Sequence, residues 1–225
     1  MNKLSPVKDA AVHNLSEHNS ILNQFIAEIR DQQIQQDRMR FRKNLERIGE
    51  IAAYEISKAL EYDESEITTP LGIASMSVLK QQPIVATILR AGLPLHSGLL
   101  NYFDHADNAF ISAYRKHHKD GSFDIHLEYV SSPDLLNRIL ILADPMLATG
   151  QSIVQTIKAL FEFGIPRHIH IVTAIASVQG IEYVKSHLPD RITIWAGAVD
   201  EELTAQAYIV PGLGDAGDLA FGIKS

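Results

Sequence analysis

The chain has 225 residues, of which 46% are apolar and 21% charged, so it can bury a large core in one or two domains. A formal net charge of −7 argues against a broad nucleic-acid-binding surface, and the absence of cysteine excludes disulfides, thiolate metal sites and a cysteine nucleophile. No apolar run reaches the ~20 residues of a membrane helix, and the N-terminus lacks a signal-peptide core, so we expect a cytoplasmic protein with no membrane or nucleic-acid partner.

The polar residues 1–20 predict an N-terminal arm, and apolar residues at helical spacing predict two helices within residues 21–60. Further along the chain, short apolar runs alternate with helical patterns. The predicted strands are 84–89, 109–114, 123–129, 139–143, 168–176, 192–195 and 208–210. The predicted helices between them are 94–102, 153–161 and 181–187.

This order of elements predicts an α/β fold with an open, mostly parallel sheet flanked by helices, because fully apolar strands are typical of parallel sheets covered on both faces. We expect one domain over residues 1–225, with a helical appendage at 21–60 and a core at 84–223. Polar and apolar residues alternate strictly over residues 123–129. That pattern predicts a strand with one wet face, in a projecting β-hairpin over 122–130.

Residues 139–150, ILILADPMLATG, place Asp144 at the carboxyl end of a buried strand. In parallel sheets this edge forms the ligand crevice. The loop Ala148 to Ser152 follows, and its amides lie at the start of a predicted helix, where an anion is favoured. The stretch therefore predicts a site for a phosphorylated sugar, with a carboxylate for ribose hydroxyls or Mg²⁺. An ordinary turn with Ser152 as the helix N-cap is the alternative.

Arg90 and Arg115 each follow directly on a predicted strand. If the two strands are parallel, both guanidinium groups lie at the same edge of the sheet as Asp144. Two arginines there would reverse the field of an acidic protein locally, as a polyphosphate ligand requires. The alternative is that each arginine is a solvated strand-end residue.

Residues 211–218, PGLGDAGD, contain the glycine spacing of a dinucleotide fingerprint at Gly212, Gly214 and Gly217. That fingerprint needs a helix directly after the loop, and we expect none in the eight residues that remain. We therefore reject the dinucleotide interpretation. The loop instead predicts close approach of glycine backbone to a flat ligand, with Asp215 at its apex. A glycine-rich terminal turn is the alternative.

Three of these segments together resemble the uracil phosphoribosyltransferases, of the type I phosphoribosyltransferase class, in order and spacing. They are ATILRAGL at 86–93, ILADPMLATGQS at 141–152 and YIVPGLGDAGD at 208–218, supported by 37–56 and by AYRKHH at 113–118. The resemblance covers about residues 20–223. It implies the pyrimidine-salvage reaction, in which uracil and phosphoribosyl pyrophosphate (PRPP) give UMP and diphosphate in the presence of Mg²⁺.

The resemblance also assigns roles to individual residues. The catalytic residues would be Asp144, Arg115 and Asp215. PRPP would contact Arg90, Arg115, Asp144, Pro145, Met146, Leu147, Ala148, Thr149, Gly150, Gln151, Ser152 and Asp215, and uracil would contact Ile209, Gly214, Asp215 and Ala216. Asp215 would reach Mg²⁺ only through PRPP or water. The family further implies a homodimer or homotetramer, with GTP as a candidate activator.

Gln151 departs from the family pattern, which has glycine at this position. If the backbone there needs a positive φ, glutamine costs about 1–2 kcal/mol; alternatively, its amide adds a donor for the phosphate. The departure motivates one alternative function, an inactive paralogue. A second alternative is a regulator that keeps the fold and binds RNA or nucleotides.

Overall fold

The computed structural model describes residues 11–117 and 123–223, with only the backbone described for 113–117 and 123–127. In this part of the chain the main sheet has the strand order β1-β10-β9-β7-β4-β5-β6. Its strands are β1 (Ala11–Asn14), β4 (Ile84–Leu89), β5 (Asp107–His117), β6 (Phe123–Ser131), β7 (Ile139–Ala143), β9 (His168–Ser177) and β10 (Ile192–Asp200). Every neighbouring pair is parallel except β5 and β6. The predicted open, mostly parallel sheet is confirmed.

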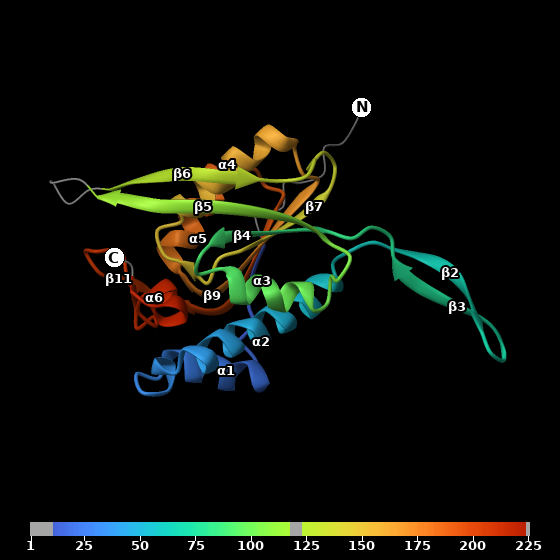
Figure 1. The fold of residues 1–225 in the computed structure, drawn as a ribbon, viewed down its shortest axis with the longest axis horizontal. Helices are drawn as coiled ribbons and strands as arrows, with labels where there is room; N and C mark the ends of the chain where they lie inside the picture. The colour runs from blue at the N-terminus through green and yellow to red at the C-terminus, as the bar shows by residue number, and fades with distance from the viewer. Residues whose placement is uncertain (1–10, 118–122, 224–225) are drawn as a thin grey trace, which may run out of the picture.

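Helices cover both faces of this sheet (Figure 1). One face carries α1 (Ile21–Arg30), α2 (Arg38–Ser57), α3 (Leu93–Leu100) and α6 (Ala216–Phe221). The other face carries α4 (Gln151–Leu160) and α5 (Val178–His187). Short 3-10 turns follow α1 and α4 at Ile34–Gln36 and Phe161–Phe163. The sheet therefore separates two apolar cores, and its central strands are buried on both faces.

The two N-terminal helices begin where the sequence supplies capping side chains. Ser20 accepts a hydrogen bond from the Leu22 amide at 3.3 Å, and Asp37 accepts one from the Arg40 amide at 3.0 Å. Such caps satisfy backbone N–H groups that have no partner within the helix. The predicted helical appendage within 21–60 is confirmed, although it packs directly on the sheet.

Two terminal segments differ from the expectation. Residues 1–20 were expected to form an arm, but Ala11–Asn14 form edge strand β1, paired in parallel with β10. No helix was expected after Gly217, but Ala216–Phe221 form α6, capped by Asp215. Both segments are too short for a periodic pattern, so only their neighbours in the fold decide their structure.

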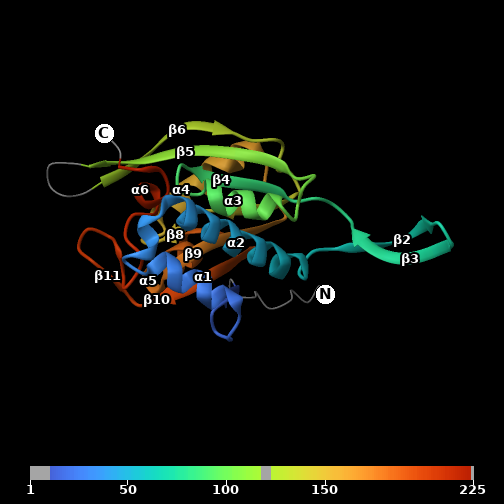
Figure 2. The same cartoon turned by 60° about the horizontal axis from the view of Figure 1, so that its bottom comes forward.

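A long β-hairpin escaped the sequence analysis. It consists of β2 (Tyr62–Thr69) and β3 (Gly72–Leu79), paired antiparallel, and it projects from the body in both views (Figures 1 and 2). The strand at 123–129 is confirmed as β6, which pairs with β5, and residue 122 of the hairpin expected over 122–130 lies outside the described residues. None of the described helices is long and apolar enough to cross a membrane.

Candidate active site

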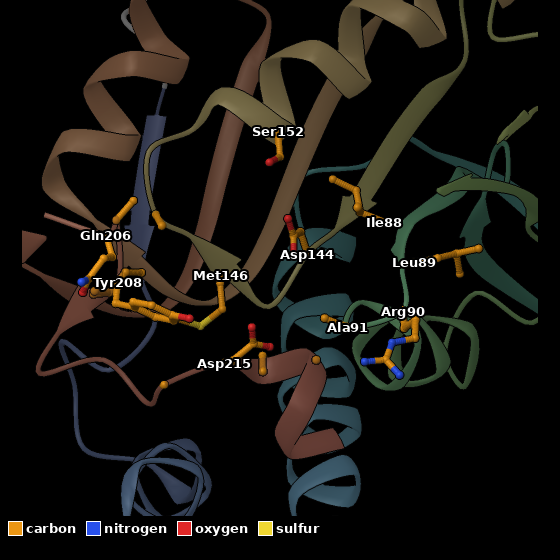
Figure 3. Close-up of a pocket in the computed structure, with 16 residues that line it drawn as sticks. Ile88, Leu89, Arg90, Ala91, Asp144, Met146, Ser152, Gln206, Tyr208 and Asp215 are labelled. Carbon is orange, nitrogen blue, oxygen red and sulfur yellow. The ribbon is translucent and has the colours of Figure 1, made fainter. Parts of the chain in front are cut away.

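A cavity of about 660 Å³ lies at the carboxyl ends of β4 and β7 (Figure 3). This is the edge at which parallel sheets bind ligands. The lining residues are Ile88, Leu89, Arg90, Ala91, Asp144, Met146, Ala148, Ser152, Gln206, Ala207, Tyr208, Ile209, Gly214, Asp215, Ala216 and Gly217. The cavity thus brings together the loop after β7 and the loop before α6, which are far apart in the sequence.

The loop after β7 is held by hydrogen bonds to the neighbouring strand β9. The carbonyl oxygen of Pro145 accepts hydrogen bonds from the Ala174 and Ile175 amides at 3.1 and 3.0 Å. Directly after Pro145, β8 (Met146–Leu147) pairs with β9, and the Leu147 amide donates to the Thr173 hydroxyl at 3.2 Å. Asp144 directly precedes these hydrogen-bonded residues and lines the cavity, so its backbone is held in place.

The next segment leads into the start of α4. We call residues 144–152 the phosphate loop, after the ligand that the sequence analysis predicts for them. Gly150 has a φ of +79°, a conformation that favours glycine. Gln151 is the first residue of α4 and is not among the described residues with positive φ. The idea that glutamine strains this position is therefore wrong, because the left-handed conformation falls one residue earlier. Gln151 is also absent from the residues that line the cavity.

Two residues that the sequence analysis missed hold the phosphate loop from α5. The Ser177 hydroxyl is buried, donates to the Ala148 carbonyl oxygen at 2.6 Å and accepts from the Gly180 amide at 2.8 Å. A Cβ on Gly180 would collide with the carbonyl oxygens of Ala148 and Leu147. The signal in the sequence was the serine at a strand end before a helix, which is an N-cap pattern.

Arg90 lines the cavity and also reaches α6. Its Nη2 donates to the Gly222 carbonyl oxygen at 3.0 Å and lies 3.6 Å from a carboxylate oxygen of Asp218. Its Nε is buried and has no hydrogen-bond partner among the described residues. A buried donor without an acceptor costs free energy that an anionic ligand would recover after a small shift of the side chain.

Arg115 lies within β5, which continues to His117, rather than after the strand as expected. β4 and β5 are parallel, as the convergence of the two arginines requires. The Arg115 side chain lies outside the described part of the structure, so its predicted role stays a prediction.

The loop before α6 forms the opposite wall of the cavity. Ile209 and Ala216 are buried, and Gly214 has a φ of +95° with open space where a side chain would be. Figure 3 shows Tyr208, Met146 and Asp215 among the side chains that line the cavity. Tyr208, with Gln206 and Ala207, belongs to the lining that the sequence analysis did not assign to the site.

Comparison with known proteins identifies the family of the chain. The profile of the family described as "Uracil phosphoribosyltransferase" matches residues 15–223. The chain belongs to the uracil phosphoribosyltransferase family. The uracil phosphoribosyltransferase of Porphyromonas gingivalis is 54% identical over 213 residues, which cover 95% of this chain and 98% of the relative. That of Thermococcus gammatolerans is 35% identical, covering 92% and 91% of the two chains.

A solved structure supports the fold as well. The structure of a protein from Aquifex aeolicus is 29% identical, has a TM-score of 0.83 and covers 94% of this chain and 98% of that one. The resemblance to uracil phosphoribosyltransferases that was drawn from three short segments is thus confirmed over nearly the whole chain. The roles of individual residues are a separate matter and are proposed below.

Proposed function

We propose that the protein transfers the phosphoribosyl group from PRPP to uracil, giving UMP and diphosphate, and that the cavity between the phosphate loop and residues 209–216 is where it does so. The observation that carries this assignment is that one cavity has a carboxylate and a helix N-terminus at one end and glycine-rich backbone at the other. A sugar phosphate and a flat base need these two kinds of surface.

The 5-phosphate of PRPP would bind at the start of α4. The amides of residues 149–152 precede or begin this ten-residue helix, where bare N–H groups and the helix dipole favour an anion. Asp144 stands at the same end of the cavity, so its carboxylate would accept hydrogen bonds from the ribose hydroxyls.

The diphosphate leaving group would bind at Arg90 and Arg115. The bond from the anomeric carbon to the diphosphate oxygen breaks, with its electron pair leaving on the diphosphate, while uracil N1 forms a bond to the same carbon and loses its proton to water. Because positive charge develops on the ribose ring, alignment of the two reactants and neutralisation of the leaving charge would supply most of the catalysis. No side chain of the phosphate loop has to form a covalent bond.

Uracil would be recognised mainly by backbone groups of Ile209, Gly214 and Ala216. Fixed donors and acceptors that match the edge of uracil would reject cytosine, whose amine presents a donor where uracil presents an acceptor. The positive φ of Gly214 and the space above it allow the backbone to come close to a flat ring.

The side chains present fit a magnesium ion that arrives with its substrate. Among the described residues no group of three or more ligating side chains is arranged to hold a metal, while Asp144 and Asp215 both line the cavity. Mg²⁺ is commonly held by one or two carboxylates, water and substrate phosphates. It would neutralise charge on the diphosphate, with Asp215 reaching it through water.

We also propose that the protein forms a homodimer or homotetramer through the β2–β3 hairpin. Leu71 and Ile73 are 99% and 70% exposed, and Met76 and Ile67 are exposed beside them. A two-stranded hairpin alone is marginally stable in water, and a run of exposed apolar side chains is typical of an interface. Changing Leu71 and Ile73 to lysine should leave a smaller particle in light scattering, while an unchanged mass would remove the hairpin from the interface.

Two further parts of the proposal concern setting and control. PRPP is multiply charged and crosses membranes poorly, so a cytoplasmic location follows from the proposed substrate. We propose GTP as a candidate activator. Measuring the rate of UMP formation and the particle mass with and without GTP tests this. An unchanged rate and particle mass with GTP would withdraw that part alone.

The site assignment is tested by Asp144→Asn, with the exposed acid Asp190 changed to asparagine as the control. Loss of the Asp144 charge should lower kcat/KM by about a hundredfold with little change in unfolding. The control should stay within about twofold. Near-normal turnover of Asp144→Asn would remove it from the site, and binding of a transcript without UMP formation would favour the regulator instead.

A further inference from the structure

We infer that the ion pair between Arg30 and Asp200 positions residues 209–216, which we call the base-binding loop, although neither Arg30 nor Asp200 lines the cavity. Arg30 ends α1, and Asp200 ends β10. The two terminal guanidinium nitrogens, Nη1 and Nη2, donate to the two carboxylate oxygens at 2.8 Å each, so the pair is bidentate. Such a pair fixes orientation as well as distance. The inference rests on the proposed role of residues 209–216 in binding uracil.

Both members of the pair also hold one residue of the loop, Gly212. The Gly212 amide donates to Asp200 Oδ2 at 2.9 Å, and Arg30 Nη1 donates to the Gly212 carbonyl oxygen at 3.0 Å. The two backbone polar groups of Gly212 are thus satisfied by opposite members of one ion pair. Rotation of the backbone at Gly212 would break both bonds at once.

The backbone at Gly212 decides where the base-binding residues lie. Its φ is +54°, and a Cβ there would collide with the carbonyl oxygen of Ile209. The chain therefore folds back tightly on Ile209 just before Gly214 and Ala216 enter the cavity wall. A shift at Gly212 would move the proposed uracil contacts on both sides of it, because they are two to four residues away.

The 3-10 turn that follows α1 contacts the next residue of the loop. With its amide in the hydrogen-bonding orientation, Gln35 donates to the Leu213 carbonyl oxygen at 2.8 Å and to the Ile29 carbonyl oxygen at 3.2 Å. The helical appendage thus contacts two successive carbonyl groups of the loop. Backbone recognition of a base needs fixed carbonyl and amide positions, and this contact supplies them from outside the cavity.

Burial makes the contact rigid. The Asp200 side chain is 7% exposed and that of Arg30 is 22% exposed. A buried carboxylate must keep its partners, because an unpaired buried charge is costly. The pair therefore holds the loop in one arrangement in the ligand-free protein, before any base binds.

A second ion pair provides a matched control. Arg40 on α2 donates to Glu28 on α1 through Nε at 2.7 Å and Nη2 at 2.9 Å, so it too is bidentate, and Glu28 is 8% exposed. Neither residue contacts the loop of residues 209–216 through any hydrogen bond described, and neither lines the cavity. Loss of the bidentate pair at Arg40 should therefore lower the stability of the fold without changing the KM for uracil.

The test compares Arg30→Lys with Arg40→Lys by steady-state kinetics and thermal unfolding. Arg30→Lys keeps the charge but loses the fork, so we expect the KM for uracil to rise about tenfold while the KM for PRPP changes less than about twofold. Arg40→Lys should leave both KM values unchanged at a similar loss of Tm. Equal changes in both KM values for Arg30→Lys, or no change in either, would overturn the inference.

Two more variants keep the test decisive. If Arg30→Lys fails to fold, Gln35→Ala removes one contact to the loop at its surface and should raise the KM for uracil severalfold; an unchanged KM would count against the inference. Ala216→Val adds two methyl groups to the cavity wall, which leaves less space for uracil, and it should raise the KM for uracil. If it does not, the proposed base site fails, whereas an effect of Ala216→Val with none from Arg30→Lys defeats only this inference.

Discussion

The buried hydroxyl of Ser177 donates a hydrogen bond to the carbonyl oxygen of Ala148 at 2.6 Å, which ties the first turn of α5 to the phosphate loop. The same hydroxyl caps α5 by accepting from the Gly180 amide. One side chain therefore stabilises a helix and fixes the backbone that we propose binds the 5-phosphate.

Replacing Ser177 with alanine removes both bonds. We expect the free energy of unfolding to fall by about 2 kcal/mol, since the helix loses its cap and the Ala148 carbonyl loses its donor. The KM for PRPP should rise severalfold. Urea unfolding and initial rates measure the two effects, with Ser186→Ala as the control because Ser186 is an exposed serine of the same helix. A normal KM for PRPP would mean that the loop holds its shape without this bond.

A larger residue at position 180 tests the same contact between α5 and the phosphate loop. A Cβ at this position would collide with the Ala148 carbonyl oxygen and would lie 2.8 Å from that of Leu147. Gly180→Ala should push the phosphate loop out of position and raise the KM for PRPP about tenfold or more. Gly72→Ala is the control, because a Cβ there meets nothing within 4 Å. Equal behaviour of the two variants would contradict the proposed packing.

For Gln151, unlike Ser177 and Gly180, we expect a substitution to leave catalysis almost unchanged. Gln151 begins α4, has no positive φ and does not line the cavity, so Gln151→Gly relieves no backbone strain and removes no part of the cavity lining in the ligand-free protein. We expect kcat/KM within about twofold of the wild type and a stability loss of up to about 1 kcal/mol from glycine in a helix. A tenfold loss in kcat/KM would show that the amide reaches the phosphate once PRPP is bound.

His170 makes the fold sensitive to acid. Burial lowers the pKa of His170 from 6.5 to about 3, with a further contribution from His168 and His13, and the Trp195 indole donates to its Nδ1 at 3.1 Å. Because the folded pKa lies below the unfolded one, stability is full above pH 6.5 and falls as the pH drops from there toward 3.

At pH 5 the loss from His170 should approach about 2 kcal/mol. His170→Gln should therefore flatten the dependence of unfolding free energy on pH between 7.5 and 5, relative to the wild type, by about that amount. His105→Gln, at an exposed histidine, should not. A wild-type protein equally stable at both pH values would show that His170 titrates normally.

The sequence predicted the elements that carry strong patterns. The strands over 84–89 and 139–143 have the predicted bounds, because each is a dense apolar run closed by a polar residue. The cavity residues Asp144, Ala148 and Ser152 also follow from their places after a strand or at a predicted helix start, and Asp215 follows from its place in the glycine-rich loop.

The rest could not be read from local pattern. The β2–β3 hairpin exposes both faces, so it has neither a core-facing period nor an apolar run. Ser177 and Gly180 matter only because α5 approaches the phosphate loop in space, and Arg30 is 170 residues from Asp200. Contacts of this kind depend on the assembled fold, and they include the pair that we infer positions the base-binding loop.

The most direct test is a single assay of the purified protein with uracil, PRPP and Mg²⁺, in which UMP is separated and quantified and cytosine replaces uracil in a parallel reaction. UMP with an equal amount of diphosphate, and no CMP, is the predicted result. Binding of uracil and PRPP without any UMP would contradict the proposed function.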